Sequence, residues 1–360
     1  MIEAHTVDAW TRAASKTTIT FRNASVLGGF AAPLFLWLAG VALVLSAART
    51  AERTGRRAAA AAAVCRRGLE IFIVAFVFRL QAFVVSPGGP VISLLRIDIL
   101  NIMGPAIVLA GVLWALTSTM AARVAVFAAG ALMMAMATPI VRAASWVDSL
   151  PVWIQWYLRP AGEHTTFTAL PWAGFVLAGA AVGSLIAAVR GDRAERRLHL
   201  WLSVAGASLV AVGVFTASRP SIYREASFWT SSPTWFAIRV GILMLALSAM
   251  YALGRTGSNS EQESDDETRT RKTNWWFRAS VRSWQMPLAT LGRSSLFVYW
   301  IHVELVYGYA SWLWRGSLPL WGTALAFVAF AALMYAAVVG RDWLLACRSA
   351  IRPRVPLPTT

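Results

Sequence analysis

The chain has 360 residues, of which 58% are hydrophobic and only 14% are charged, and its mean hydropathy is +0.57. A soluble globular domain ordinarily carries about 25% charged residues, so these values exclude a soluble enzyme of ordinary composition and a disordered chain. The formal net charge is +16. Because the arginines flank apolar runs instead of forming a basic stripe, we interpret the charge as a topology signal and expect no nucleic-acid partner.

Nine apolar windows are long enough to cross a bilayer, which takes about 20 mostly apolar residues. The windows are approximately 27–48, 68–86, 97–116, 121–141, 170–189, 198–217, 234–254, 284–308 and 318–340. A backbone in lipid must satisfy its own hydrogen bonds, and no window alternates with the period of a β-barrel strand. The predicted fold is all-α, a polytopic transmembrane helix bundle of about nine complete spans in a single integral membrane domain, residues 1–360.

The beginning of the chain predicts one further helix that is incomplete. Residues 1–26 contain no apolar core of a signal peptide, yet the topology puts them outside the membrane. The stretch MIEAHTVDAW is interpreted as the outer end of a clipped first helix. We therefore expect about 20 more residues to be encoded upstream of Met1.

The loop charges predict one orientation for the bundle. Alternation puts 21 Lys and Arg residues in five inner stretches and 9 in five outer stretches. The inner stretches are 49–67, 117–123, 190–198, 255–283 and 341–360. By the positive-inside rule, these stretches and the C-terminus face the cytoplasm. Cys65 and Cys347 then lie on the reducing side and are expected to be free thiols.

Two connecting segments differ in composition. The segment at about 256–274 is polar and highly charged, and we expect a flexible cytoplasmic linker there, between the first seven windows and the last two. The outer loop 142–169 instead carries Trp146, Trp153, Trp156 and Tyr157. Such aromatic residues form an interfacial belt or, alternatively, cover the mouth of an acceptor site.

Ionisable groups in apolar helices are costly, so each of them is a functional candidate. In the predicted topology a set of such groups, together with one amide, lies toward the outer face: His5, Asp8, Arg79, Asp98, Asn101 and His302. Asp98 and Asn101, three residues apart, share a helix face. The structural alternative is that Arg79 pairs with Asp98 and locks two helices together.

The window 284–308 contains the most specific stretch, LGRSSLFVYWIHVELVYG. Ser295, Tyr299 and His302 follow one another at i, i+4 and i+7, so they share one face and can line a cavity. His302 alone would more often be a structural, hydrogen-bonded histidine. The four histidines are dispersed and no HExxH or CxxC spacing occurs, so we expect no metal.

Four short stretches share a pattern with a known membrane family. GRSSLFVYWIH, residues 292–302, looks like a G-x-N-S-x-L-V-Y-x-x-H motif, and GGFAAPLFLWLAG, residues 28–40, like an early proline-containing span. MIEAHTVDAW looks like the end of a first helix, and RIDILNIMG, residues 96–104, like a segment with I-L-Q. Asn101 stands in place of that glutamine, Ser294 in place of the motif's asparagine, and the opening D-x-x-R-G element is missing. Together these stretches resemble heparan-α-glucosaminide N-acetyltransferase and its bacterial relatives.

The resemblance implies a membrane acyltransferase that moves an acyl group, such as acetyl, from cytosolic acyl-CoA to a sugar or glycan at the outer face. It implies catalytic roles for His5, Asp8, Asp98, Asn101 and His302. His5 would be the general base or carry the acyl group, and Asp8 or Asp98 would orient it. Asn101 or Tyr299 would stabilise the oxyanion, and His302 would line the acyl tunnel or be a second acid–base group.

The donor and the other expected partners follow from the same hypothesis. We expect acetyl-CoA or another acyl-CoA to be bound by Arg293, Ser295, Tyr299 and Arg79. The remaining partners are the membrane lipid and the sugar or glycan acceptor.

Two other classes of function stay open. A transporter or a flippase of lipid-linked sugars also needs charges in the membrane, but it predicts an internal repeat. We find no such repeat, because the division into seven and two windows is asymmetric. A purely structural membrane subunit is the third class, but it does not explain why polar groups gather toward the outer face.

Overall fold

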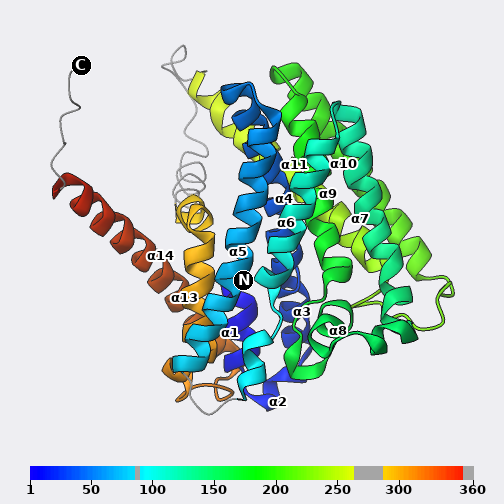
Figure 1. Ribbon diagram of the computed structural model, residues 1–360. Coiled ribbons are helices and arrows are strands. Elements are labelled where there is room, and N and C mark those ends of the chain that lie inside the picture. The colour runs from blue at the N-terminus through cyan, green and yellow to red at the C-terminus, as the bar shows by residue number, and fades with distance from the viewer. Residues whose placement is uncertain (86–89, 263–286, 352–360) are drawn as a thin grey trace, which may run out of the picture. The chain divides into compact units, whose positions relative to one another are not determined.

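The computed structural model describes residues 1–85, 90–262 and 287–351, and its long elements are all α-helices (Figure 1). The helices divide the chain into two compact units. One unit comprises Phe30–Glu261, and the other joins Met1–Gly29 to the residues from Gln262 onward.

Eight helices among the described residues are long and apolar enough to cross a membrane. They are Ile19–Thr54, which joins α3 (Ile19–Gly28) to α4 (Ala31–Thr54), α5 (Arg57–Val85), α6 (Ile99–Leu116), α7 (Met120–Ala143), α9 (Ala169–Ala188), α10 (Asp192–Ala217), most of α11 (Pro233–Gln262) and most of α14 (Leu320–Ile351). They coincide with eight of the nine predicted windows, which confirms an all-α polytopic fold.

The ninth window, 284–308, is interrupted. Its helix α13 spans Ser295–Tyr307, only 13 residues. Helical residues 287–293 precede it, but the backbone leaves the helical conformation at Ser294, with φ −104° and ψ 21°. The described part of this window is therefore two short helical pieces.

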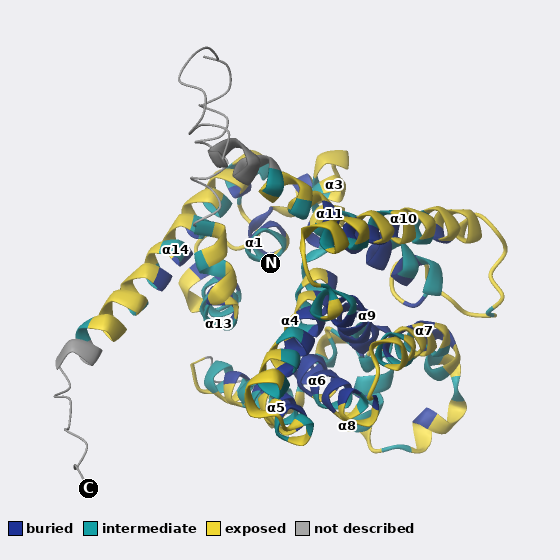
Figure 2. Cartoon of the chain, turned by 90° about the horizontal axis from the view of Figure 1, so that it is seen from above, coloured by how far each residue is buried: buried dark blue, intermediate teal, exposed yellow. Residues whose placement is uncertain are grey.

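Helix α9 is the centre of the unit Phe30–Glu261. Nearly all of its residues from Pro171 to Ser184 are buried, and α4 and α7 pack along it (Figure 2). A Cβ atom on Gly40 would collide with the carbonyl oxygen of Val176, and one on Gly179 with the carbonyl oxygen of Trp37. Only glycine permits so close an approach, which brings the backbones of α4 and α9 into contact.

The outward faces of the long helices are apolar. Leu200, Val212 and Phe215 on α10, and Leu325 and Val328 on α14, are each more than half exposed. Lipid acyl chains solvate such faces in a membrane, where no hydrophobic effect drives side chains inward. The exposure of these residues is therefore what a membrane-spanning helix requires.

The segment between α7 and α9 is folded. It contains three short helices, namely η2 (Ser145–Ser149), α8 (Val152–Leu158) and η3 (Gly162–His164). Arg159 pairs with Asp148 at 2.7 Å, and the rings of Trp156 and His164 stack at 4.5 Å. The backbone of Ile97 exchanges two hydrogen bonds of 3.0 Å with His164 and Thr166. This segment therefore lies against the start of α6.

The other unit has its core around Trp10, at the end of α1 (Ile2–Trp10). Trp10 is buried with Val298, Val306, Phe330 and Met334 of α13 and α14. The short helices α2 (Ala13–Lys16) and η4 (Tyr309–Ser311) complete this unit. Far-separated parts of the chain thus meet in a single core.

Backbone pairing also joins α1 to the segment before α14. Gly316 N–H donates to the Ala9 carbonyl at 2.9 Å, Leu318 N–H to the Trp10 carbonyl at 3.0 Å, and Arg12 N–H to the Leu318 carbonyl at 2.9 Å. These three bonds form a short parallel bridge between Thr11 and Leu318. Together with the Trp10 core they fix the rotation of α1 about its own axis.

The predicted linker lies only partly within the described residues. Its first residues, 256–262, continue α11 as a helix, and the rest, 263–274, lies outside the described range. Its flexibility and the single-domain organisation stay predictions. Cys65 and Cys347 are free thiols, as the topology predicts.

Candidate functional site

Two imidazole rings meet between α1 and α13. The ring centroids of His5 and His302 lie 5.2 Å apart, with the planes inclined at 48°. His302 is 1% exposed, and His5 is partly buried. The structure therefore brings together the two histidines that the sequence singled out, although they belong to opposite ends of the chain.

The hydrogen bonds of His302 define its tautomer. Its Nδ1 lies 2.6 Å from the carbonyl oxygen of Val298, which can only accept, so Nδ1 carries the proton. Its Nε2 then presents a lone pair, and this atom is buried with no hydrogen-bond partner among the described residues. Buried polar atoms are nearly always bonded, so an unbonded basic nitrogen marks His302 as a candidate acid–base group.

A chain of polar groups sets the tautomer of His5 in the same way. The Tyr307 hydroxyl donates its only proton to Asp8 Oδ2 at 2.9 Å, so its oxygen accepts from His5 Nδ1 at 3.1 Å. His5 Nε2 is thereby left with the lone pair. The Asp8 carboxylate, with Lys16 Nζ 3.8 Å away, can stabilise positive charge that develops on His5.

Helix geometry explains why His5 and Asp8 act together. They are three residues apart on α1 and so project from the same face. Trp10, also on α1, is held in the core and donates through Nε1 to the Val306 carbonyl at 3.3 Å. The buried Trp10 and the bridge at Thr11 therefore turn the face with His5 toward α13.

The predicted donor-binding residues on and just before α13 differ in burial and in distance from His302. Tyr299 is buried, and its ring centroid lies 5.8 Å from that of His302. Arg293 and Ser295 are exposed, near the start of α13 and about 10–14 Å along the helix from His302. Ser294 is buried instead and accepts a hydrogen bond of 2.8 Å from Arg341, which the sequence analysis missed.

The other predicted polar group lies in the unit Phe30–Glu261. Arg79 Nη2 contacts Asp98 Oδ2 at 2.8 Å. Asp98 also caps α6, since its Oδ1 accepts from Leu100 N–H at 3.0 Å, and Asn101 Oδ1 accepts from Asp98 N–H at 3.0 Å. This arrangement is a capping box joined to an ion pair. It matches the helix-locking alternative stated above for Arg79 and Asp98.

Tyr157 on α8 belongs to the same neighbourhood. The pKa of Tyr157 is raised to about 12, chiefly by burial, while an interaction with the Asn101 side chain opposes the rise and the negative charge of Asp98 adds to it. Tyr157 therefore keeps its proton at neutral pH. Within the described residues, Asn101 Nδ2 and Arg79 Nε are buried without hydrogen bonds.

Sequence spacing gave no sign of Tyr307. It follows His302 by five residues, which is about 140° around a helix and therefore off the predicted polar face. It meets His5 because α1 comes from elsewhere in the chain. The one sequence signal that could have suggested Tyr307 is its position at the end of the helix with the polar face, as the tyrosine of the VYG that closes the stretch LGRSSLFVYWIHVELVYG.

The described residues include no group of three or more His, Cys, Asp or Glu side chains that could hold a metal ion. The two imidazoles stand as a pair, with one carboxylate reached through Tyr307. What this pair can do is accept, hold and return a proton.

The eight long apolar helices among the described residues define an integral membrane protein built from helices. Residues 1–223 match the family described as heparan-alpha-glucosaminide N-acetyltransferase, catalytic. The chain belongs to this family, and its function is of the membrane acyltransferase type. The matched range contains His5, Asp8, Arg79, Asp98 and Asn101 and ends before α13. No curated protein and no solved structure matches the chain.

Proposed function

We propose that this protein transfers an acyl group, acetyl in the simplest case, from acyl-CoA to a hydroxyl or amine of a sugar or glycan. The observation that carries the proposal is the contact between partly buried His5 and buried His302, since the hydrogen bonds at Nδ1 leave the lone pair of each ring on Nε2. The family name, which refers to acetyl transfer to a glucosaminide, supports the choice of donor and acceptor.

The proposed step conserves atoms and charge. The acceptor oxygen or nitrogen attacks the thioester carbonyl carbon while His5 Nε2 takes its proton. The tetrahedral intermediate collapses, the carbon–sulfur bond breaks, and the CoA thiolate leaves. It takes up the proton that His5 accepted, either directly or after that proton has passed to His302 Nε2, so both imidazoles return to their neutral tautomers. Asp8 and Tyr307 act as positioning residues, since they hold His5 in the tautomer that can accept the proton.

The start of α13 supplies groups suited to an acyl-CoA donor. Arg293, at the end of the helical piece before α13, is exposed and can pair with phosphate. Ser295 and Tyr299 lie between it and His302 along the chain, on α13. Arg79 is already held by Asp98, which leaves it a weaker candidate for donor binding. Catalytic roles for Asp98 and Asn101 stay predictions.

The positive-inside pattern supports a sidedness for the reaction. It favours a cytoplasmic linker and C-terminus in the inner membrane, and therefore a cytosolic donor and an external acceptor. Labelling with an impermeant thiol reagent in intact cells tests this. We expect a Trp153→Cys variant to be labelled and a Ser260→Cys variant to be protected, in a background with Cys65 and Cys347 replaced by serine. The reverse pattern would overturn the proposed orientation.

The central experiment measures thiol release from acetyl-CoA by the full chain in nanodiscs, with and without an amino-sugar acceptor. His5→Ala and His302→Ala should each lower the acceptor-dependent rate by about 10²–10⁴-fold, the usual range for a lost acid–base group. His164→Ala, which removes a histidine of the segment before α9, is the matched control and should keep the rate. Thermal unfolding of each variant reports the folded fraction. Full activity in both folded histidine variants would reject the acyltransferase site and favour transport.

A further inference from the structure

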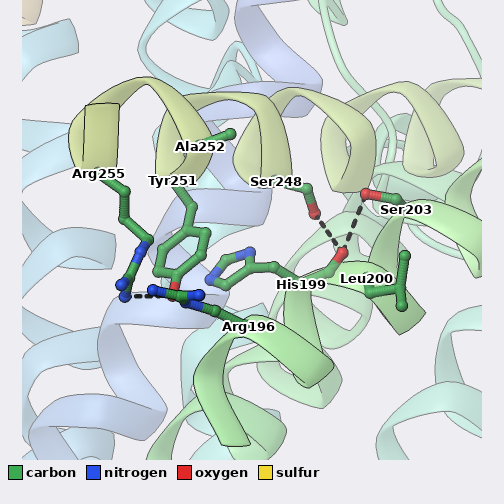
Figure 3. Close-up of a pocket in the computed structure, with 8 residues that line it drawn as sticks. All are labelled: Arg196, His199, Leu200, Ser203, Ser248, Tyr251, Ala252 and Arg255. Carbon is green, nitrogen blue, oxygen red and sulfur yellow. Dashed lines mark hydrogen bonds between the residues drawn. The ribbon is translucent and has the colours of Figure 1, made fainter. Parts of the chain in front are cut away.

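A pocket of about 420 Å³ opens between α10 and α11, within the unit Phe30–Glu261 (Figure 3). Its lining residues all come from these two helices: Arg196, His199, Leu200, Ser203, Ser248, Tyr251, Ala252 and Arg255. None of them belongs to the acid–base cluster on α1 and α13. The pocket is referred to below as the α10–α11 pocket.

One end of the pocket is cationic. Figure 3 shows the guanidinium groups of Arg196 and Arg255 converging near the Tyr251 hydroxyl, to which Arg255 donates at 3.2 Å. Arg255 also lies 3.5 Å from Asp192, whose side chain is 82% exposed and therefore offsets little charge. Arg196 has no side-chain hydrogen bond or ion pair with the residues that the structure describes. The Arg196 guanidinium therefore lies beside a second cation with no anion against it among the described residues, an arrangement that a bound anion would stabilise.

His199 adds an unbonded polar atom to the wall. Its ring stacks on Tyr251, with centroids 3.9 Å apart and planes inclined at 9°. The residue is only 9% exposed, and its Nδ1 is buried without a hydrogen-bond partner in the described ranges. Ser203 and Ser248 donate to its backbone carbonyl at 2.9 and 3.1 Å, which holds it in place. An atom this buried and unbonded indicates a missing partner.

The pocket continues into the apolar outer face of α10. Leu200, which lines it, is 64% exposed, and Trp201 and Val204 on the following turn are 64% and 48% exposed. In the predicted topology this end of both helices faces the cytoplasm, beside the arginine-rich stretch 190–198. The pocket thus has a cationic end at headgroup level and an apolar side toward the acyl chains.

We propose that the α10–α11 pocket binds the phosphate of an anionic headgroup. Arg196, Arg255 and His199 contact the phosphate, and Leu200 and Val204 pack against the first methylene groups of an acyl chain. A phospholipid supplies both kinds of contact, whereas a soluble phosphate compound supplies only the first. This site is independent of the acyl-transfer chemistry proposed for His5 and His302.

Native mass spectrometry of the full chain, released from nanodiscs of phosphatidylcholine with or without phosphatidylglycerol, tests the proposal. We expect wild type to retain phosphatidylglycerol in preference to phosphatidylcholine. The double variant R196Q/R255Q should bind phosphatidylglycerol at least about tenfold more weakly, since it loses charge-assisted hydrogen bonds. R193Q/R197Q removes the same total charge, from positions next to Arg196 on α10 that do not line the pocket, and should stay within about twofold of wild type. If both double variants lost phosphatidylglycerol affinity equally, general surface charge would explain the binding, and the proposal would be overturned.

A third variant and two competitors complete the test. H199F keeps a ring on Tyr251 but removes the ring nitrogens. It should weaken phosphatidylglycerol binding about tenfold, and unchanged binding would remove His199 from the proposed site. If inorganic phosphate or free CoA displaced phosphatidylglycerol from wild type and not from R196Q/R255Q, that result would support a phosphate site and would identify a soluble phosphate compound as its ligand. Absence of competition, with phosphatidylglycerol still retained, would assign it to lipid. Wild-type protein that neither prefers phosphatidylglycerol nor binds phosphate would overturn the proposal.

Discussion

The two polar groups in this protein differ in which atoms they leave unbonded. Around Asp98, a cation, an anion and a helix start are combined, and the buried atoms left over are N–H donors on Arg79 and Asn101. Around His5 and His302, the Nδ1 proton of each ring is bonded, and the buried atom left over is a basic nitrogen, His302 Nε2. A donor can only hold a ligand, whereas a lone pair can also take a proton. The comparison matches helix locking for the first group and supports the proposal of proton transfer for the second.

The largest expected effect tests whether the histidines form a working pair. If His5 and His302 act in one step, the double variant His5→Ala/His302→Ala should be little slower than either single variant, because groups that act as a unit are not additive. Steady-state rates of acceptor-dependent thiol release measure this. Losses that multiply, giving about 10⁴–10⁸-fold in total, would show that the two rings act independently.

The next effect concerns stability around Arg79. Arg79→Ala leaves the Asp98 carboxylate buried without its cation, which should lower the free energy of unfolding by about 3–5 kcal/mol. Detergent-induced unfolding followed by circular dichroism measures the loss. Arg66→Ala, on the same helix but 82% exposed and paired with Glu70, is the control and should change little. A stable Arg79→Ala protein with no catalytic activity would reverse the assignment of the two groups.

A smaller effect is expected for the positioning residues of His5. Tyr307→Phe removes one hydrogen bond to His5 and one to Asp8, and it should lower kcat about tenfold with KM almost unchanged. Asp8→Asn should have a similar effect, and the two changes combined should be less than additive, since both disrupt one chain of hydrogen bonds. A rise in KM alone would instead make Tyr307 and Asp8 part of substrate binding.

The smallest effect concerns the capping box. Asn101→Ala removes the side chain that accepts from Asp98 N–H, and it should cost about 1 kcal/mol of stability. Acyl-transfer activity per folded molecule should stay near that of wild type. A loss of about 10²–10³-fold in kcat, the effect of removing an oxyanion donor, would restore the role that the sequence suggested for Asn101.

Hydrophobic length predicted the membrane helices well, because a helix in lipid needs only a continuous apolar run. It failed at window 284–308, since the backbone turn at Ser294 does not alter composition. It also gave no warning that residues 142–169 fold into short helices against Ile97, because those contacts depend on tertiary packing.

The candidate site was predicted in part. His5 and His302 were singled out because imidazoles are rare and costly in apolar helices. Their polar partner Tyr307 was not, since its contact depends on the rotation of a different helix. The α10–α11 pocket was missed for the same reason: Arg196 and Arg255 are ordinary loop-flanking arginines until two helices bring them together.

The bridge between Thr11 and Leu318 has a consequence for biosynthesis. His5 and Tyr307 are 302 positions apart, so α1 emerges from the ribosome long before the helices that complete its core. Until then the Trp10 side chain and the open backbone edge at Ala9–Arg12 have no partner in their own unit. A chaperone or insertase at the membrane would therefore meet an exposed N-terminal segment throughout most of translation. The proposed acid–base pair can form only after α13 has been synthesised, because His302 and Tyr307 lie on that helix.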